Sequence, residues 1–278
     1  MIREMINSRE LIWNLVKRDL KTRYKSSILG FFWSFGKPLL LMLILWFVFS
    51  TVIRLPQFGV RNPDFPFPLH LLTGILAWTY FTGGLMEAMY SVYQNSNLIK
   101  KVKLNPAVFP VSSVLSNLVN YLLALLVLFG FMIAYGAPFT FNILLLPFII
   151  LLQTFLMITL SLLLSALFVF YRDVASLLEV FMTGLFYASP IIYPFWLARD
   201  ELLQRGWKPV FYLYILNPLI PILAGYRRLL FAPLLQPREI SDTSLMILLG
   251  YALGLSLIFY FLFKKIFKGY ARRFADEL

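Results

Sequence analysis

Long apolar stretches, separated by short polar ones, set the pattern of this 278-residue chain. Runs of about 18 or more nearly uncharged residues recur, and such runs are typical of helices that cross a lipid bilayer. The pattern predicts an all-α, polytopic membrane protein in which residues 1–278 form a single transmembrane domain. We expect six transmembrane helices, at about 31–53, 69–90, 111–135, 143–170, 177–194 and 245–263.

The N-terminal segment, residues 1–30, has a different pattern. Its apolar residues recur every four positions and form one stripe, with lysines and arginines on the other faces; the stripe is Ile12, Val16, Leu20 and Tyr24. This spacing predicts an amphipathic helix that lies along the membrane surface. Such a helix either only orients the chain or binds a partner, and the pattern leaves both open. The segment has no apolar core followed by a cleavage site, so we do not expect a signal peptide.

The segment 195–244 is apolar but is repeatedly interrupted by Pro218, Pro221, Gly225 and Pro233. No piece of it is long enough to cross a membrane. Broken helices at membrane depth persist only where protein or a cavity satisfies their backbone groups. We predict two short re-entrant or interfacial helices on the outer side, at about 208–216 and 219–235, with an ordinary amphipathic loop as the alternative.

The charge supports the membrane assignment and adds an orientation. Only 14% of the residues are charged, against about 25% in soluble domains. Sixteen Lys and Arg residues fall in the segments on the side of the termini, and eight fall in the loops on the other side. Cytoplasmic loops carry the excess of Lys and Arg, so we expect both termini in the cytoplasm. Orientation and anionic lipid explain the net charge of +12, and we expect no nucleic-acid partner.

The residue types limit the chemistry. The chain has no cysteine and one histidine, His70, which excludes thiol catalysis, disulfides and Cys/His zinc sites. One stretch is similar to a phosphate-binding loop, but five residues instead of four separate Gly30 from Gly36. Pro38 also follows Lys37 where that loop needs a Ser or Thr for Mg²⁺. We therefore expect no catalytic residue, no metal and no cofactor in this chain.

Ionisable residues inside membrane spans are candidates for function, and Lys37, His70 and Glu87 stand out. All three are near span ends, where a long side chain can reach the interface. We expect a structural role for Glu87, as the partner of a cytoplasmic lysine or of a helix N-terminus. An ion-coupled carrier needs carboxylates near the midplane. The sequence therefore predicts a transport protein whose energy source is another chain.

Aromatic residues make up 18% of the chain. Trp33, Tyr193 and Trp196 fit the aromatic belt of a membrane interface, whereas Trp46 and Trp78 are near the middle of their spans. Aromatic faces inside spans could line a path for sugars, and ordinary packing is the alternative for each ring.

The 91–110 loop is short and basic, and it carries an apolar patch of Leu98, Ile99 and Val102. A short helix here would present this patch to a cytoplasmic partner. A solvated, positively charged loop is the alternative, and composition leaves both open.

Four stretches in order resemble the ABC-2-type transport permeases of the polysaccharide-export branch, which are the membrane subunits that export O antigen, capsule and teichoic acid. These stretches are LVKRDLKTRYKSSILGFFWSFGKPLL (15–40), NSNLIKKVKLNPAVFPVSSVLSNLVN (95–120), FYRDVASLLEVFMTGLFYASPIIYP (170–194) and NPLIPILAGYRRLLF (217–231). Together they extend over essentially the whole chain.

The resemblance implies a homodimer of two permease copies with two copies of a separate nucleotide-binding ATPase subunit, which holds ATP and Mg²⁺. The implied cargo is a lipid-linked polysaccharide that is moved outward across a bacterial plasma (inner) membrane. Membrane lipids are the further partners. An exporter of a drug or lipid is the alternative, followed by a membrane enzyme of glycan assembly.

The resemblance also implies roles for particular residues. A coupling helix over 95–106 seats in the ATPase through Asn95, Leu98, Ile99, Lys100, Lys101, Val102 and Lys103. The interface helix contributes Arg18, Asp19, Arg23 and Tyr24. Channel-lining candidates in spans one and five are Trp33, Phe35, Trp46, Phe186, Tyr187 and Tyr193. The outer gate helices, within 208–235, contribute Asn217, Pro218, Tyr226 and Arg227.

Overall fold

The structure, a computed structural model, describes residues 5, 7–25, 30–52, 67–102, 104–231, 234 and 240–278. Every regular element within these residues is helical, which confirms the all-α class for this part of the chain. The elements are α2 (Arg9–Lys25), α3 (Gly30–Phe47), the π-helical turn η1 (Val48–Val52), α4 (Phe67–Gln94), α5 (Ser96–Lys101), α6 (Val108–Ala134), the 3₁₀ turn η3 (Phe141–Leu145), α7 (Leu146–Phe170), α8 (Val174–Tyr187), α9 (Phe195–Gln204), α10 (Lys208–Ile215), α11 (Leu219–Phe231), α12 (Asp242–Ala271) and α13 (Phe274–Glu277).

Several helices are long and apolar enough to cross a membrane. Among the described residues, four segments meet this condition, namely Phe35–Val52, Val108–Ala134, Phe141–Phe170 and Asp242–Ala271. The total rises to five if α10 and α11, which meet at 71°, are counted as one broken span. The break is at Asn217 and Pro218, because proline disfavours the helical conformation of the residue before it.

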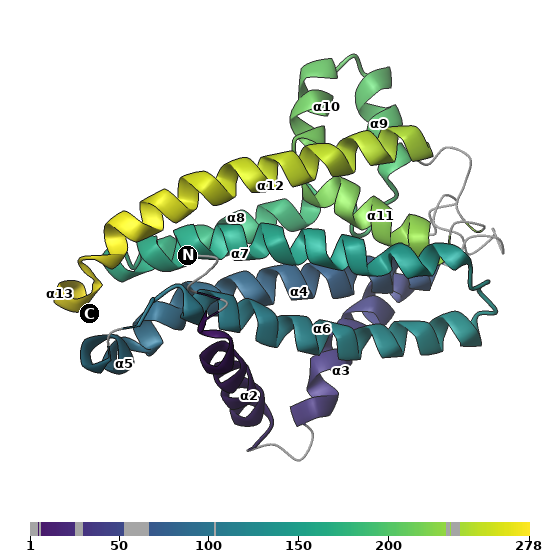
Figure 1. Cartoon of the computed structure of the whole chain (residues 1–278). Helices are drawn as coiled ribbons and strands as arrows, with labels where there is room; N and C mark the ends of the chain where they lie inside the picture. Colours follow the sequence, from purple (N-terminus) through teal and green to yellow (C-terminus); the bar gives the residue numbers. More distant parts are fainter. Residues whose placement is uncertain are drawn as a thin grey trace.

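α4 falls on the predicted span 69–90 and lies at the centre of the bundle, between α6 and α7 (Figure 1). Its 28 residues make it about 42 Å long, which is enough to cross a bilayer. Threonine, glycine, serine and tyrosine residues lower its hydropathy, and most of its residues are buried by the helices around it. Protein rather than lipid therefore surrounds polar residues such as Thr73 and Ser91.

α8 is shorter than the predicted span 177–194. It ends at Tyr187 and has 14 residues, so it extends roughly 21 Å, less than the hydrocarbon core of a bilayer. The chain then turns, because Pro190 and Pro194 lack the amide hydrogen that would continue a helix. An unpredicted helix, α9, follows and buries Phe195 and Trp196.

α2 occupies the middle of the segment predicted to be an amphipathic helix. In Figure 1 it stands at a steep angle to the long helices of the bundle. It packs on α6, and its Leu15 and Val16 are buried. Trp13 is 54% exposed. One apolar face of α2 therefore docks on α6, whereas the stripe predicted a helix that lies along the membrane surface.

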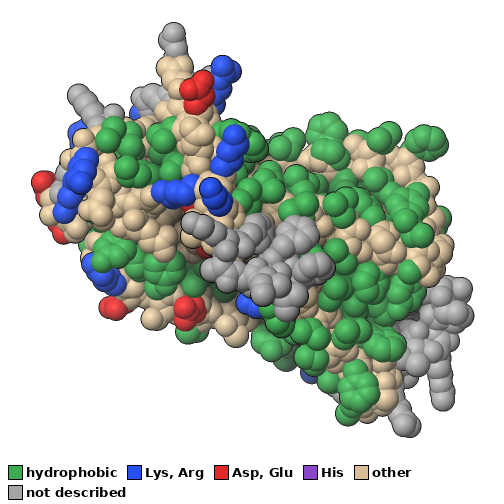
Figure 2. Space-filling model, turned by 90° about the horizontal axis from the view of Figure 1, so that it is seen from below, with side chains coloured by type: hydrophobic (Ala, Val, Ile, Leu, Met, Phe, Trp, Pro, Cys, Tyr) green, Lys and Arg blue, Asp and Glu red, His purple; other side chains and the backbone are tan. Residues whose placement is uncertain are grey.

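The apolar core consists of a central cluster and a smaller cluster near each end. One end cluster joins α2, α6, α12 and α13 through residues such as Leu15, Phe109, Phe267 and Phe274. The other joins α9, α11 and α12 through Phe195, Ile220 and Leu245. Figure 2 shows hydrophobic side chains over the flank of the bundle, whereas charged side chains gather along α2 and toward the α5–α13 end.

Candidate functional site

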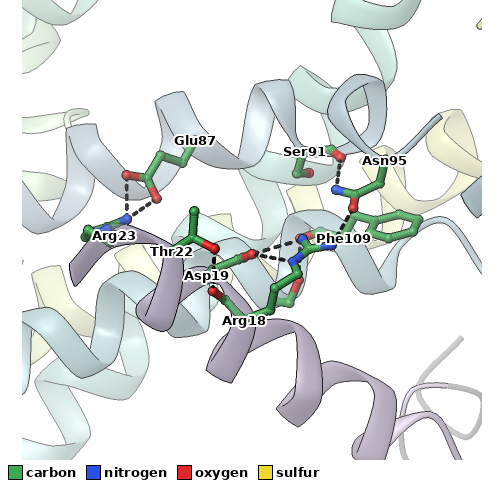
Figure 3. A network of polar contacts seen from close by, with 9 residues as sticks. Arg18, Asp19, Thr22, Arg23, Glu87, Ser91, Asn95 and Phe109 are labelled. Atoms are coloured by element: carbon green, nitrogen blue, oxygen red, sulfur yellow. Dashed lines mark hydrogen bonds and ion pairs between the residues drawn. The ribbon is translucent and has the colours of Figure 1, made fainter. Parts of the chain in front are cut away.

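A charged network joins α2 to α4 (Figure 3) and, through Asn117, to α6. Arg23 donates through Nη2 to both carboxylate oxygens of Glu87, with 2.6 Å to Oε1. Arg23 Nη1 donates to Asn117 Oδ1 at 3.4 Å, and Asn117 Nδ2 donates to Glu87 Oε2 at 2.7 Å. Glu87 therefore has a structural partner as expected, but that partner is an arginine of α2 and not a lysine or a helix end.

A second set of contacts ties α2 to the start of α5. Arg18 donates to Asp19 Oδ1 from Nε at 3.1 Å and from Nη2 at 2.9 Å. Arg18 Nη1 donates to Asn95 Oδ1 at 2.9 Å, and Asn95 Nδ2 donates to the carbonyl oxygen of Ser91 at 2.7 Å. The structure thus pairs Arg18 with Asp19, and it holds Arg23, the third of the predicted interface-helix residues, in the separate contact with Glu87. The side chain of the fourth, Tyr24, lies outside the described residues.

α5 is the short helix that follows Asn95. It extends over Ser96–Lys101 and is shorter than the predicted 95–106, because the backbone becomes extended at Val102 and the chain turns at Pro106 before α6. Its outer face exposes Leu98, Lys100, Lys101 and Val102, whereas Ile99 packs on the cluster beneath. Lys103 lies outside the described residues. α5 therefore has an anchored inner side and an open face that is apolar and basic.

Four helices enclose a cavity of about 410 Å³ next to the Arg23–Glu87 pair. α2 contributes Arg23, and α3 contributes Trp33, Lys37 and Pro38. α4 and α6 contribute the remaining lining, which includes Thr79, Tyr80, Gly83, Asn117 and Tyr121. Lys37 and Glu87, two of the ionisable residues selected from the sequence, thus face one cavity.

The predicted gate residues pack around the N-terminal end of α4. Asn217 Oδ1 accepts from the Leu219 amide at 3.0 Å, and its Nδ2 donates to Ser189 Oγ at 2.9 Å. The buried Arg227 donates from Nη2 to the carbonyl oxygen of Ile191 at 3.0 Å. These contacts fix the start of α11 and join α11 to the turn after α8.

The other two predicted gate residues take different positions in the same region. Tyr226 OH donates to Gln153 Oε1 at 2.8 Å, which connects α11 to α7. Pro218 lies at the bend between α10 and α11. Sequence reasoning missed Gln153, although a lone amide in an apolar span is a visible signal.

The six predicted channel-lining aromatics lie on two helices and in one turn. Trp33, Phe35 and Trp46 are on α3, and the other three are Phe186 and Tyr187 of α8 and Tyr193 of the turn that follows. Trp33, Trp46 and Tyr187 are exposed. Phe186 packs edge-on against Trp78 with ring centroids 5.6 Å apart, and Tyr193 OH donates to the carbonyl oxygen of Tyr187 at 2.9 Å.

Sequence reasoning also missed Glu179, an acid inside the predicted fifth span. Its side chain is exposed and lines a second cavity, of about 450 Å³, with Trp78, Thr82, Thr183 and Phe186. A single carboxylate in a 14-residue apolar helix is a signal that can be read from the sequence.

Comparison with known proteins adds to this geometry. Residues 10–231 match the family model described as "ABC-2 type transporter". The chain is 30% identical over 239 residues to the "O-antigen export system permease protein RfbA" of Myxococcus xanthus, covering 86% of this chain and 87% of that protein. It is 29% identical over 233 residues to a protein of the same name from Klebsiella pneumoniae, covering 84% of each.

Proposed function

The chain belongs to the ABC-2 type transporter family, and on this premise we propose that it is the membrane permease of a polysaccharide exporter. It moves a lipid-linked polymer outward across the plasma membrane, and a separate ATPase subunit supplies the energy. The observation that carries this proposal is the 30% identity, over most of both chains, to a permease named for O-antigen export. The family and the apolar helices make this chain a multi-pass plasma-membrane protein.

The geometry of α5 supports the coupling to an ATPase. Its exposed face of Leu98, Lys100 and Lys101 fits a cleft on a cytoplasmic partner. Its inner end is tied to α2 through the Arg18–Asn95 hydrogen bond, and it continues from the central helix α4. Closing and opening of the ATPase pair would then move α5, α2 and α4 together, as a rigid-body or hinge change.

We further propose that two permease copies meet and that two ATPase subunits dock beneath them. α3 and α8 leave large apolar side chains exposed, for example Ile44 at 58% and Val180 at 75%. A second copy would cover part of these faces and place the channel-lining candidates around one path. In this arrangement α3, α4, α6, α7 and α12 provide five membrane passes, and α8 together with the turn that follows it provides the sixth. α10 and α11 close the outer end, and both termini are cytoplasmic.

Charge reversal on α5 tests the coupling. We expect Lys100→Glu with Lys101→Glu to lower polymer export about fivefold or more in proteoliposomes containing the permease and its ATPase, with ATP hydrolysis retained. The matched control is Lys264→Glu with Lys265→Glu, which reverses two charges on α12 and should leave export unchanged. Full-rate export after Ile99→Pro, which disrupts the helix itself, would contradict the coupling role.

The cargo is tested with the same complex. ATP hydrolysis that rises on addition of the lipid-linked polymer supports polysaccharide export. A rise with drugs or simple lipids alone favours the other kind of exporter, and formation of a new glycan product indicates an enzyme. Alanine substitution of the aromatic candidates in α3 and α8 should lower export more than membrane abundance, and equal losses would indicate packing.

A further inference from the structure

The cavity between α2, α3, α4 and α6 changes in polarity along its length. At the level of Glu87 it is lined by charged side chains, and at the level of Leu76 and Ala124 it is apolar. Glu87 and Leu76 are eleven residues apart on α4, which corresponds to roughly 16 Å of helix. Hydroxyl and amide side chains lie between these two levels. This gradient matches an amphipathic ligand whose polar group lies toward the α5 end of the bundle.

The charged side chains of the cavity lining carry an excess of one positive charge. Two cations, Arg23 and Lys37, and one carboxylate, Glu87, line the cavity. The contacts with Glu87 and Asn117 hold the Arg23 guanidinium in place and engage its two terminal nitrogens. Since a guanidinium has five N–H donors, some of its donors remain for a ligand. The Lys37 side chain is exposed, so its ammonium group is accessible to an anion.

Aromatic rings line the wall beside these charges. Tyr80 and Tyr121 stack with their centroids 4.8 Å apart and their planes at 8°. The Trp33 ring is 48% exposed and also lines the cavity. Tyr80 and Tyr121 are buried, so the exposed ring that can pack on the apolar face of a sugar is that of Trp33, and Thr79 and Asn120 line the same cavity.

We propose that this cavity binds the headgroup of a lipid whose phosphate or diphosphate carries a sugar. The phosphate lies between Arg23 and Lys37, the sugar packs on Trp33, and the first part of the lipid chain extends toward Leu76. The identification of the ligand as the carrier of the exported polymer rests on the proposed function. This places a loading site within one permease copy, and Trp33 is common to this site and to the proposed path between two copies.

The absence of cysteine allows a direct test. Gly83 lines the cavity, and a Cβ there would lie 3.6 Å from Asn117 Oδ1, an ordinary contact. Gly83→Cys therefore places a single thiol inside the cavity. The rate of its labelling by a small maleimide is measured on the complex with its ATPase, in phosphatidylcholine nanodiscs, as a polyprenyl diphosphate bearing one sugar is added. Gly269→Cys, which has open space around it on α12, is the control.

We expect the sugar-bearing polyprenyl diphosphate to protect Gly83→Cys and to leave Gly269→Cys unprotected. In the Gly83→Cys background, Lys37→Gln should raise the half-protecting concentration about tenfold, because a charge-assisted hydrogen bond to phosphate is lost. Lys37→Arg should restore protection. Lys21→Gln, which removes an exposed charge from α2 outside the cavity lining, should have no effect.

Three results would overturn the proposal. Absence of protection excludes the site. Equal protection by phosphatidylglycerol shows a general site for anionic lipid, and equal protection by free diphosphate shows a site for a soluble anion. The proposed function is tested separately, by measuring polymer export by the same complex. If the lipid protects the thiol but the complex exports no polymer, the binding site is supported and the proposed function is rejected. If the complex exports polymer but the lipid does not protect the thiol, only the binding site is rejected.

Discussion

Gly74, near the N-terminal end of α4, is the position where one added methyl group should most destabilise the packing of α11 and of the turn after α8 against α4. A Cβ on this residue would lie 2.8 Å from the carbonyl oxygen of Ile191 and 3.0 Å from Arg227 Nη2. A Cβ does not approach a backbone oxygen this closely, so Gly74→Ala must move the turn after α8 away from α4. The same movement disturbs the 3.0 Å hydrogen bond from Arg227 to Ile191.

The magnitude follows from these two effects. Overpacking a buried contact costs about 1–3 kcal/mol, and a weakened hydrogen bond from a buried charged donor costs about 1.5–3 kcal/mol. The effects share one displacement and are not additive, so we expect a loss of about 3 kcal/mol in the free energy of unfolding. For a chain of this size that loss lowers Tm by about 6 °C or more.

Thermal unfolding of the purified permease, followed by tryptophan fluorescence, measures this loss. Gly83→Ala is the matched control, because it adds the same methyl group to the same helix at an ordinary contact distance of 3.6 Å. Replacing glycine by alanine inside a helix is otherwise favourable by about 0.5–1 kcal/mol, so this control should be neutral or stabilising. The reasoning is refuted if Gly74→Ala has the same Tm as the wild type, or if Gly74→Ala and Gly83→Ala lower Tm by the same amount.

Two further predictions concern the polar contacts between helices. Arg23→Gln and Glu87→Gln should each lower stability, and the double variant should lose less than the sum, with a coupling of about 1 kcal/mol because both side chains are partly exposed. Additive losses in this thermal-unfolding cycle would show that the pair does not stabilise the docking of α2. Tyr226→Phe should cost about 1 kcal/mol, because Gln153 Oε1 loses its buried donor. Tyr251→Phe, which removes an exposed hydrogen bond, should leave Tm unchanged, and equal shifts would contradict the role of burial.

Predictions from the sequence succeeded where the deciding feature is local. The break at Pro218 was predicted from the proline itself, and the four-residue spacing of the apolar stripe with Val16 predicted that this segment is helical. The end of α8 at Tyr187 was missed, because length was judged from hydropathy and the prolines of the following turn were given too little weight. Glu179 was missed although it is visible as a lone acid.

Other features depend on residues far apart in the chain. Arg23 and Glu87 are 64 residues apart, and Arg18 and Asn95 are 77 apart, so no local pattern pairs them. The sequence offers several polar residues as partners for Arg18 and Arg23, and the packing of α2 on the bundle decides which of them these arginines contact. The cavity beside Lys37 likewise exists only once four helices are assembled.

The sequence by itself determined that this chain is a helical membrane protein of the ABC-2 type, because the length and hydropathy of a span and the order of family motifs are properties of the chain in one dimension. Only the tertiary structure decided which polar side chains meet, which face of α5 stays open and where a charged cavity lies. Each of these depends on contacts between distant segments, and the energy of such contacts is fixed by packing and burial rather than by neighbours in sequence.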